Sequence, residues 1–295
     1  MFMDIVFVVL HYIVADETCK CVSYIEKNID TDNYRIVIVD NASPNGSGDI
    51  LEKQYKDNLK VVVLKNQKNL GFARGNNVGY RYAKKYFKPQ YLVMMNNDVY
   101  LLEKRLKEKL SEEFRRSGFY VLGPMIYTRD GRCDVNPDNA VFKNVADIDR
   151  MLHIYKKMYR RYKYYYAFVF YRLTPVIDMI LGKKPVKKRK NFLFRAENVK
   201  LHGCFMVFSE KYILEYEGLD ESTFLYWEEE FLYKHMMCNH KKTVYCPDII
   251  VYHQEDAATD SIVAGERKKK MFLYEKYMES LEELRKLYIY YDSAL

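Results

Sequence analysis

The sequence predicts an α/β fold, built on a mostly parallel sheet with helices on both faces. Strand and helix patterns alternate along residues 5–95, as they do in parallel sheets with helical crossovers. The strand segments are near-continuous β-branched runs, which is typical of strands buried on both faces. Carboxylates follow two of these runs, at Asp40 and Asp98, and such sheets bind ligands beyond the carboxyl ends of their strands. We therefore expect the two carboxylates to meet at one cleft.

The first half is expected to hold four strands and three helices. The strands are apolar runs bounded by turn residues, at 5–10, 34–40, 59–64 and 91–95. The first helix, at 16–29, shows helical spacing of its apolar residues, and a short helix at 49–56 follows a turn rich in Gly, Ser, Asn and Pro. A third helix is expected at 73–86.

The second half changes composition before the same pattern returns. Residues 151–195 are dense in Tyr, Lys and Arg and nearly free of acids, and Pro175, Gly182 and Pro185 predict a break into helical pieces. Beyond this basic, Tyr-rich insertion we expect strands at 201–209 and 243–253, a helix at 228–239, and a charged helical tail at 262–291.

The composition is that of a soluble globular protein with excess positive charge. The 295 residues carry a net charge of +8, so anionic partners such as nucleotides, nucleic acid or an acidic membrane face are expected. Six scattered cysteines without zinc-ligand spacing favour reduced thiols in a cytosolic protein over a disulfide scaffold. The apolar run at 5–10 is too short for an export signal or a membrane span.

The loop after the strand at 34–40 is the first candidate ligand loop. Asp40, Asn41 and Ser43 open a turn of small residues. It is either a polar turn that caps the next helix, or a loop in which Asp40 accepts hydrogen bonds from a nucleoside. The residues alone leave both interpretations open.

A second candidate loop covers residues 69–79. Gly71, Arg74 and Asn77 stand near a helix start, where backbone N–H groups and a guanidinium suit a diphosphate. The glycines fit neither the dinucleotide-binding fingerprint nor a P-loop, so neither nucleotide signature applies.

The stretch "MMNNDVY" ends a predicted strand with two amides and a carboxylate. Asn96 and Asp98 offer the hard oxygen ligands that Mg²⁺ or Mn²⁺ prefers when the ion also bridges phosphates. One carboxylate suffices only if a diphosphate and a further ligand complete the shell. The alternative is ordinary turn material, because Asn-Asn-Asp is common in turns.

An acidic turn at 228–230 begins a predicted helix, and His253 ends a later apolar strand. Three acids in a first helical turn complement the helix dipole and can be merely solvated. Trp227, the only Trp of the chain, directly precedes them and indicates a shaped pocket rather than open surface. His253 by itself favours a structural role over a ligand role.

Taken in order, these stretches resemble the family 2 glycosyltransferases, especially the bacterial polysaccharide and rhamnosyltransferase-like branch. No single motif is decisive, but the whole series in order is strong. The matching stretches are "VVLHY" (8–12), "VDNASPNGS" (39–47), "NLGFARGNNVGY" (69–80), "MMNNDV" (94–99), "LHGCFMVFSEKYI" (201–213), "GLDESTFLYWEEEFL" (218–232) and "PDIIVYH" (247–253).

The resemblance implies a GT-A fold, a Rossmann-like α/β domain that binds a nucleotide sugar. It makes Asp40 the contact to the base, helped by the backbone near Tyr12. It makes Asp98 the last acid of the metal-holding Asp-x-Asp motif, with Asn96 departing from that motif at its first position. His253 then completes the metal shell or touches the diphosphate. The remaining residues implied on the donor side are Asn41, Ser43, Gly71, Arg74, Asn77 and Asn97.

On the acceptor side, the resemblance places the catalytic base on Glu228-Glu229, with Glu229 favoured, and implies acceptor contacts at Trp227 and Gly203. Displacement at an anomeric carbon needs a base for the acceptor hydroxyl and a cation, Mn²⁺ or Mg²⁺, for the departing diphosphate. The implied reaction is transfer with inversion from a UDP- or dTDP-linked sugar to a glycan or a polyprenyl-diphosphate-linked acceptor in cell-surface polysaccharide synthesis.

The resemblance also suggests how the chain is divided. Residues 1–125 would bind the nucleotide sugar, 126–200 would connect and carry the insertion, 201–255 would bind acceptor and catalyse, and 256–295 would form the tail. The insertion at 151–195 would either contact anionic lipid at the inner face of the cell membrane or pack as a helical subdomain, on itself or in a homodimer.

Two other functions compete with this one. An inactive glycosyltransferase-like scaffold is opposed by the retention of Asp40, Asp98, Glu229 and His253. A basic nucleic-acid-binding protein would leave the acidic turn at 228–230 unexplained, so we expect no nucleic-acid partner.

Overall fold

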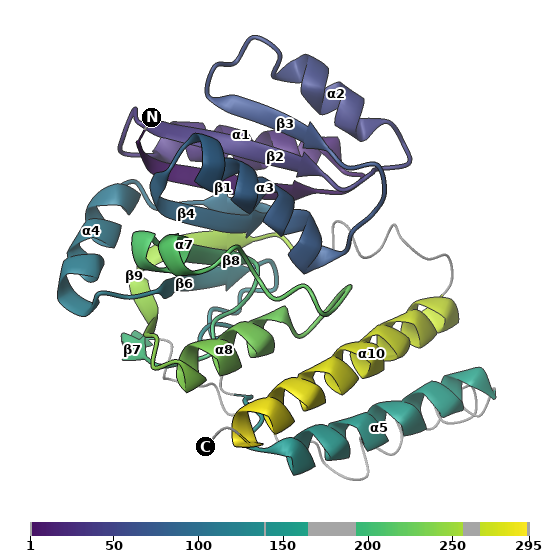
Figure 1. Cartoon of the computed structure of the whole chain (residues 1–295). Helices are drawn as coiled ribbons and strands as arrows, with labels where there is room; N and C mark the ends of the chain where they lie inside the picture. The colour runs from purple at the N-terminus through teal and green to yellow at the C-terminus, as the bar shows by residue number, and fades with distance from the viewer. Residues whose placement is uncertain (1, 139, 165–192, 256–265, 294–295) are drawn as a thin grey trace.

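The computed structural model describes residues 2–138, 140–164, 193–255 and 266–293 (Figure 1). The elements of its first part, in chain order, are β1 (Met3–His11), α1 (Ala15–Asn28), β2 (Tyr34–Asp40), α2 (Ser47–Gln54), β3 (Val61–Lys65), α3 (Phe72–Tyr86) and β4 (Pro89–Asn96). Those of the second part are β5 (Val99–Leu101), α4 (Leu106–Ser117), β6 (Val121–Thr128), α5 (Val145–Lys163), β7 (Ala196–Glu197), β8 (Phe205–Ser209), α7 (Glu210–Glu215), α8 (Glu228–Cys238), β9 (Thr243–His253) and α10 (Glu266–Ser293).

A single sheet organises the chain, with strand order β3-β2-β1-β4-β8-β6-β9-β5 and the short β7 paired to β9. Strands β3, β2, β1 and β4 are parallel, as predicted. Beyond β4 the sheet is mixed: β8 is antiparallel to β4, β9 is parallel to β6, and β5 is antiparallel to β9. The predicted α/β class with helices on both faces is confirmed.

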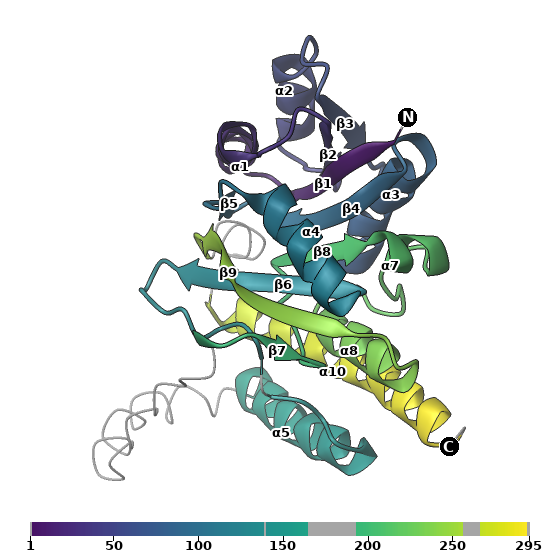
Figure 2. The same ribbon diagram turned by 90° about the vertical axis from the view of Figure 1, so that its left-hand side faces the viewer.

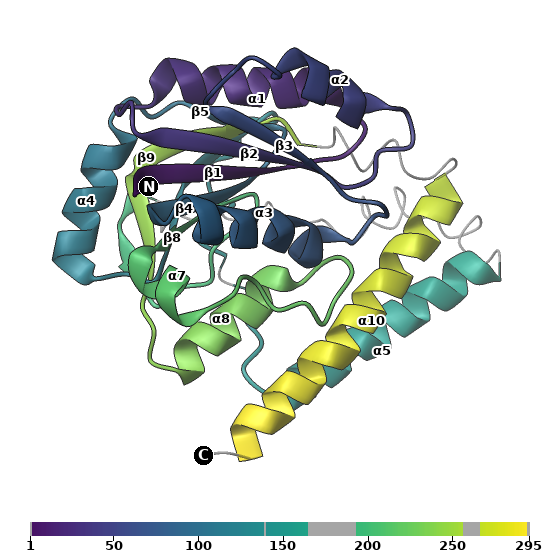
Figure 3. The ribbon, with the colours of Figure 1, turned by 45° about the horizontal axis from the view of Figure 1, so that its top comes forward.

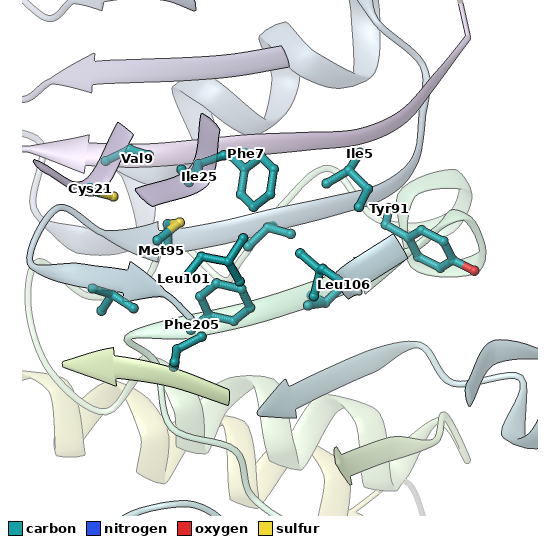
Figure 4. Close-up of a cluster of buried hydrophobic side chains, with 14 of the residues drawn as sticks. Ile5, Phe7, Val9, Cys21, Ile25, Tyr91, Met95, Leu101, Leu106 and Phe205 are labelled. Carbon is teal, nitrogen blue, oxygen red and sulfur yellow. The ribbon is translucent and has the colours of Figure 1, made fainter. Parts of the chain in front are cut away.

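Both faces of the sheet are buried, which explains why its central strands are almost wholly apolar. In β1, Ile5, Phe7 and Val9 face a core closed by α1, α2 and α4, and Figure 4 shows part of this core. Val6 and Val8 face the opposite core, closed by α3, α7 and α8. Figure 3 shows α1 and α2 on one side of the strands and α3 on the other. Each such side chain, fully withdrawn from water, stabilises the fold by about 1.5–3 kcal/mol.

The structure adds elements that the sequence patterns did not predict. Three of them are β5, α4 and β6, which lie between the fourth and fifth predicted strands. Helix α5 begins at Val145, before the change of composition, because Asn144 accepts a hydrogen bond from the Asp147 amide and caps the helix. The helical pieces expected around Pro175, Gly182 and Pro185 lie outside the described residues.

Helices α5 and α10 form an antiparallel pair beside the sheet domain, here called the α5–α10 pair (Figures 1 and 2). Arg267 of α10 donates to the backbone carbonyls of Tyr162 and Lys163 at the end of α5. The pair packs on α8 through a third apolar cluster that includes Phe231 and Leu284. Within the described part of the chain, no helix is both long enough and apolar enough to cross a membrane.

Candidate active site

A cleft of about 730 Å³ lies beyond the carboxyl ends of β1 and β4. One wall comes from the strand ends, and the other comes from the start of α8 and the α5–α10 pair. The predicted site residues that line it are Tyr12, Asn41, Gly71, Asn96, Asn97, Asp98, Gly203, Trp227, Glu228, Glu229 and His253.

Asp98 and His253 form one corner of the cleft. Pairing of β5 with β9 sets Val99 opposite His253 and thereby brings the two residues together. His253 Nε2 lies 3.4 Å from Asp98 Oδ1. Apart from this ion-pair contact, Asp98 Oδ1 and His253 Nδ1 are buried without a hydrogen-bond partner, so a bound ion or molecule could still supply one.

This corner fits a divalent cation that takes only part of its shell from protein. A carboxylate oxygen such as that of Asp98 is the ligand type that Mn²⁺ and Mg²⁺ prefer, and His253 would add an imidazole nitrogen, a ligand better suited to a transition metal than to Mg²⁺. Among the described residues, no three His, Cys, Asp or Glu side chains gather as a complete metal site. Remaining ligands would have to come from a diphosphate and water.

The protonation of His253 in this corner depends on the residues around it. Burial disfavours a charged His253, but its contacts with Asp98 and Cys204 outweigh burial and raise its pKa to about 11. A second imidazole, His202, stands 5.9 Å from His253 between ring centres. The sequence patterns singled out neither His202 nor Cys204 as a cleft residue, since a lone His or Cys in an apolar stretch carries no signal.

Asp40 lies behind the cleft wall and not among the residues that line it. Its Oδ1 accepts hydrogen bonds from the amide of Ser43 at 3.1 Å and from the hydroxyl of Ser43 at 2.5 Å. The Ser43 hydroxyl in turn accepts from the amide of Ile13. The expected meeting of Asp40 and Asp98 at one cleft is therefore corrected: Asp40 shapes the loop over which the cleft is built.

Asn41 and Gly71 join the two candidate loops at the cleft. The Asn41 amide donates to the Gly71 carbonyl and to Asn69 Oδ1, at 3.0 Å each. Gly71 has a φ of 81°, and a Cβ there would lie 2.0 Å from the Phe224 carbonyl oxygen. Glycine is required because the loop before α8 approaches the 69–71 backbone directly.

Arg74 and Asn77, expected at a diphosphate, are used elsewhere. Arg74 is exposed and donates from Nε to the Glu221 carbonyl. Asn77 is fully buried, and its amide group bonds both the N–H and the C=O of Leu219 at 2.8 Å. Neither residue lines the cleft, because this side of α3 holds the 218–223 loop in place.

Asn96 and Asn97 both line the cleft but differ in their contacts. Asn97 is buried and donates to Thr18 Oγ1 at 3.0 Å, so its amide ties β4 to α1. Asn96, half-buried, is the better placed of the two to reach a bound molecule.

The acidic turn that begins α8 stands on the opposite wall. Glu229 is half-buried, and its Oε1 accepts from the Gly203 amide at 3.3 Å. A Cβ on Gly203 would come within 2.8 Å of that oxygen, so glycine permits the approach. Glu228 is buried with Oε1 unpartnered, and burial together with the nearby Glu229 raises its pKa to about 8.

The third acid of this turn, Glu230, is fully buried and anchors α8. Its Oε2 accepts from Lys200 Nζ at 2.7 Å, and its Oε1 accepts from the Tyr288 hydroxyl at 3.0 Å. Lys200 also pairs with Asp138 at 2.9 Å. This buried network connects α8, α10 and the segment before β8.

An aromatic group lies next to the acidic turn. Tyr226 and Trp227 both have positive φ values, 76° and 70°, a strained conformation for bulky residues that is common at functional sites. Tyr155 of α5 and Tyr277 of α10 line the cleft beside them. Both tyrosines were missed from the sequence, where they stand in segments that indicated only a helical surface.

The fold is of the GT-A class: an α/β sheet with its cleft beyond the ends of the parallel strands. The chain belongs to the family described as "Glycosyl transferase family 2", whose model matches residues 7–212. A search of curated proteins found no significant match.

Several solved structures share this fold. The S. aureus TarS crystal structure aligns with a TM-score of 0.53 and 14% identity over 92% of this chain and 39% of TarS. TarS 1–349 in complex with UDP-GlcNAc aligns with a TM-score of 0.54 and 13% sequence identity, over 92% of this chain and 65% of the TarS 1–349 chain. GalNAc-T7 with UDP, GalNAc and Mn²⁺ aligns with a TM-score of 0.57 and 13% sequence identity, over 86% of this chain and 44% of the GalNAc-T7 chain. This chain thus spans well under half of the full TarS chain.

Proposed function

We propose that the protein transfers a sugar from a UDP- or dTDP-linked donor to a hydroxyl of a glycan or lipid-linked acceptor, with inversion. The observation that carries this proposal is a single cleft that sets Asp98 and His253 on one wall and Glu228 and Glu229 on the other. Support comes from family membership and from similar folds that bind UDP-GlcNAc, or UDP with Mn²⁺.

Glu229 is proposed as the general base. Inverting transfer needs a carboxylate that takes the proton of the attacking hydroxyl. Burial and the nearby Glu229 raise the pKa of Glu228 to about 8, so at neutral pH most of that carboxyl carries a proton and must lose it before it can act as a base. Glu229, half-buried beside Gly203, reaches the same cleft and takes the role.

Asp98 and His253 are proposed to hold Mn²⁺ or Mg²⁺ together with the donor diphosphate. Such an ion offsets the negative charge that grows on a departing diphosphate. The protein's own contribution is to keep both side chains in place by pairing β5 with β9, with the Gln254 amide donating to the Asp98 carbonyl at 2.9 Å.

The nucleoside is proposed to lie against Tyr12 and Asn41, where the ends of β1 and β2 meet the cleft. Asp40 and Ser43 would act mainly through their mutual hydrogen bonds, which set the course of this loop. Gly71 and Asn96 lie on the same wall and would contact the phosphates or the sugar.

The cellular role proposed is cell-surface polysaccharide synthesis in a bacterium, in the rhamnosyltransferase-like branch. Contact with an anionic membrane face is supported by α5, which carries exposed Lys156, Lys157, Arg160 and Lys163 and no acid after Asp149. A homodimer through the same pair of helices is the alternative use of this surface, and vesicle flotation with and without anionic lipid separates the two.

The donor site is tested by thermal unfolding with UDP, dTDP or GDP, with and without Mn²⁺. UDP or dTDP with Mn²⁺ should raise the unfolding temperature, and Asp98→Asn should lose the increment that depends on Mn²⁺. Asp138→Asn, a carboxylate change elsewhere in the cleft, should keep it. Failure of all three nucleotides to stabilise the protein would overturn the proposed function, and an Mn²⁺ increment retained in Asp98→Asn would overturn the metal assignment. A screen of the corresponding nucleotide sugars for hydrolysis then identifies the donor.

A further inference from the structure

Four aromatic side chains from three separate segments form one wall of the cleft. Tyr155 comes from α5, Tyr226 and Trp227 from the loop before α8, and Tyr277 from α10. We call these four residues the aromatic wall. Their ring centres are closely spaced: Tyr155 to Tyr277 is 5.0 Å, Trp227 to Tyr277 is 5.9 Å and Tyr226 to Tyr277 is 4.7 Å.

The wall contains polar atoms without a partner. Trp227 Nε1 is buried with no hydrogen-bond acceptor. Glu228, only 6% exposed and next in sequence, has its Oε1 in the same condition. A buried donor and a buried carboxyl oxygen left unpaired cost stability, so a molecule that supplies a partner for either gains binding free energy.

The wall is held rigidly. The Ser280 hydroxyl of α10 donates to the Leu225 carbonyl at 2.8 Å, which fixes the loop that carries Tyr226 and Trp227. Trp227 also packs against Phe142, with 5.3 Å between ring centres. The positive φ values at Tyr226 and Trp227 are thereby maintained, and the rings are in place before any ligand arrives.

We propose that the aromatic wall is a carbohydrate subsite that holds a pyranose ring of the acceptor, with Tyr155 and Tyr277 as specificity-determining residues. The apolar C–H face of a pyranose would lie on the rings, while its hydroxyls would serve the Trp227 N–H and the Glu228 carboxyl. The inference rests on the proposed function, which it deepens by naming the acceptor class. An isoprenoid chain fits less well, because it would cover the same surface and leave both polar atoms unpaired.

This assignment gives the α5–α10 pair a part in acceptor choice. Tyr277 lies beyond residue 212, where the match to the family model ends. Most of helix α5, from Met151 onward, belongs to the basic, Tyr-rich insertion. The donor wall is thus built from the sheet, whereas the acceptor wall takes two of its rings from helices added beside it.

The single tryptophan makes the test direct, because all tryptophan emission comes from Trp227. The protein with saturating UDP and Mn²⁺ is titrated with the methyl glycosides of glucose, galactose, N-acetylglucosamine and rhamnose, and separately with farnesyl phosphate. At least one glycoside should change the emission saturably. Tyr155→Leu and Tyr277→Leu should each weaken its Kd by about tenfold. Tyr274→Leu is the matched control, a tyrosine of α10 that packs on Tyr155 without lining the cleft, and should leave the Kd nearly unchanged.

Thermal stabilisation by UDP, measured on the same samples, separates this inference from the proposed function. If UDP stabilises the protein and no glycoside changes the emission, the subsite is wrong while the proposed function stands. If farnesyl phosphate alone responds and loses its response in the two leucine variants, the wall binds lipid and the inference is overturned. If UDP, dTDP and GDP all fail to stabilise the protein as well, both the subsite and the proposed function are overturned. If a leucine variant unfolds, Tyr155→Phe and Tyr277→Phe replace it, since they keep the aromatic ring and should keep glycoside binding. Saturation-transfer NMR on the wild-type protein tests contact between the glycoside and the rings without any variant.

Discussion

The two walls of the cleft differ in how their polar groups are satisfied. On the wall built from strand ends, Asn41 and Asn97 are bonded to neighbouring loops and helices, and Asp40 behind them is bonded to Ser43. On the wall that begins α8, Trp227 Nε1 and Glu228 Oε1 have no partner and the backbone is strained. Asp98 and His253 are the exception on the first wall.

This difference separates side chains that hold the shape of the cleft from side chains that still have a hydrogen bond to offer a ligand. A side chain whose hydrogen bonds are complete holds its loop and is costly to redirect toward a substrate. A buried polar group without a hydrogen-bond partner lowers the stability of the fold, and the rest of the structure must offset that cost. Such a group gains a partner only when a ligand binds. Substitutions on the two walls should therefore act on different observables.

The largest effect is expected at the proposed base. Glu229→Gln should lower kcat for sugar transfer by up to about 10⁴-fold, because the amide cannot accept the acceptor proton. UDP-dependent thermal stabilisation should persist, since the donor wall is untouched. Glu228→Gln is the adjacent control and should cost about tenfold or less in kcat. Equal residual activity in both variants would sink the assignment of Glu229.

The next effect concerns the buried anchor of α8. Lys200→Met leaves Glu230 buried without its cation and should lower the free energy of unfolding in urea by about 3–5 kcal/mol. Lys242→Met removes a more exposed ion pair, in which Lys242 Nζ lies 2.9 Å from a Glu197 carboxylate oxygen. This variant should change the free energy of unfolding by less than about 1 kcal/mol. Comparable losses in the two variants would show that the network around Glu230 does not anchor the helix.

A smaller, pH-dependent effect is expected at Glu228. Its pKa is raised from 4.5 to about 8 on folding, so the native state holds a proton that the unfolded chain has lost between these values. Stability from this group is therefore complete below about pH 4.5 and falls as the pH rises toward about 8. Glu228→Gln should remove that decline, a relative gain on the order of 5 kcal/mol at about pH 9. Parallel stability curves for the two proteins between pH 5 and pH 9 would contradict the raised pKa.

The smallest effect distinguishes two asparagines on the donor side. Asn77→Ala should lower the free energy of unfolding by about 1–2 kcal/mol through its lost bonds to Leu219, while UDP binding stays within about twofold. Asn96→Ala should weaken nucleotide-sugar binding and barely change stability, because Asn96 lies half-buried in the cleft. If Asn77→Ala weakened UDP binding more than Asn96→Ala did, Asn77 would have to be assigned to donor binding after all.

The sequence predicted the strand-built wall well because its signals are local. A buried parallel strand that ends in polar residues places them at one sheet edge, and this reasoning put Asn96 and Asp98 at the cleft. The same reasoning placed Asp40 there as well, but the local pattern does not show that Asp40 bonds Ser43 through one carboxylate oxygen and stays out of the cleft lining.

The rest depends on contacts between segments far apart in the chain. Asn77 stands at a helix start, as a phosphate ligand would, yet its partner Leu219 comes 142 positions later. Tyr155 and Tyr277 meet only because α5 and α10 pack antiparallel, and nothing in either helix alone signals that pairing. Residue type indicated the chemistry, whereas the packing of helices decided which side chains reach the cleft.

The strand order also bears on the synthesis of the chain. The parallel strands β3, β2, β1 and β4 are complete once residue 96 has been made. Strand β9, which ends at His253, lies between β6 and β5, so β5 waits unpaired until nearly the whole sheet domain has been translated. The corner formed by Asp98 and His253 can therefore form only after β9 has been made, and a chain that ends before β9 lacks it.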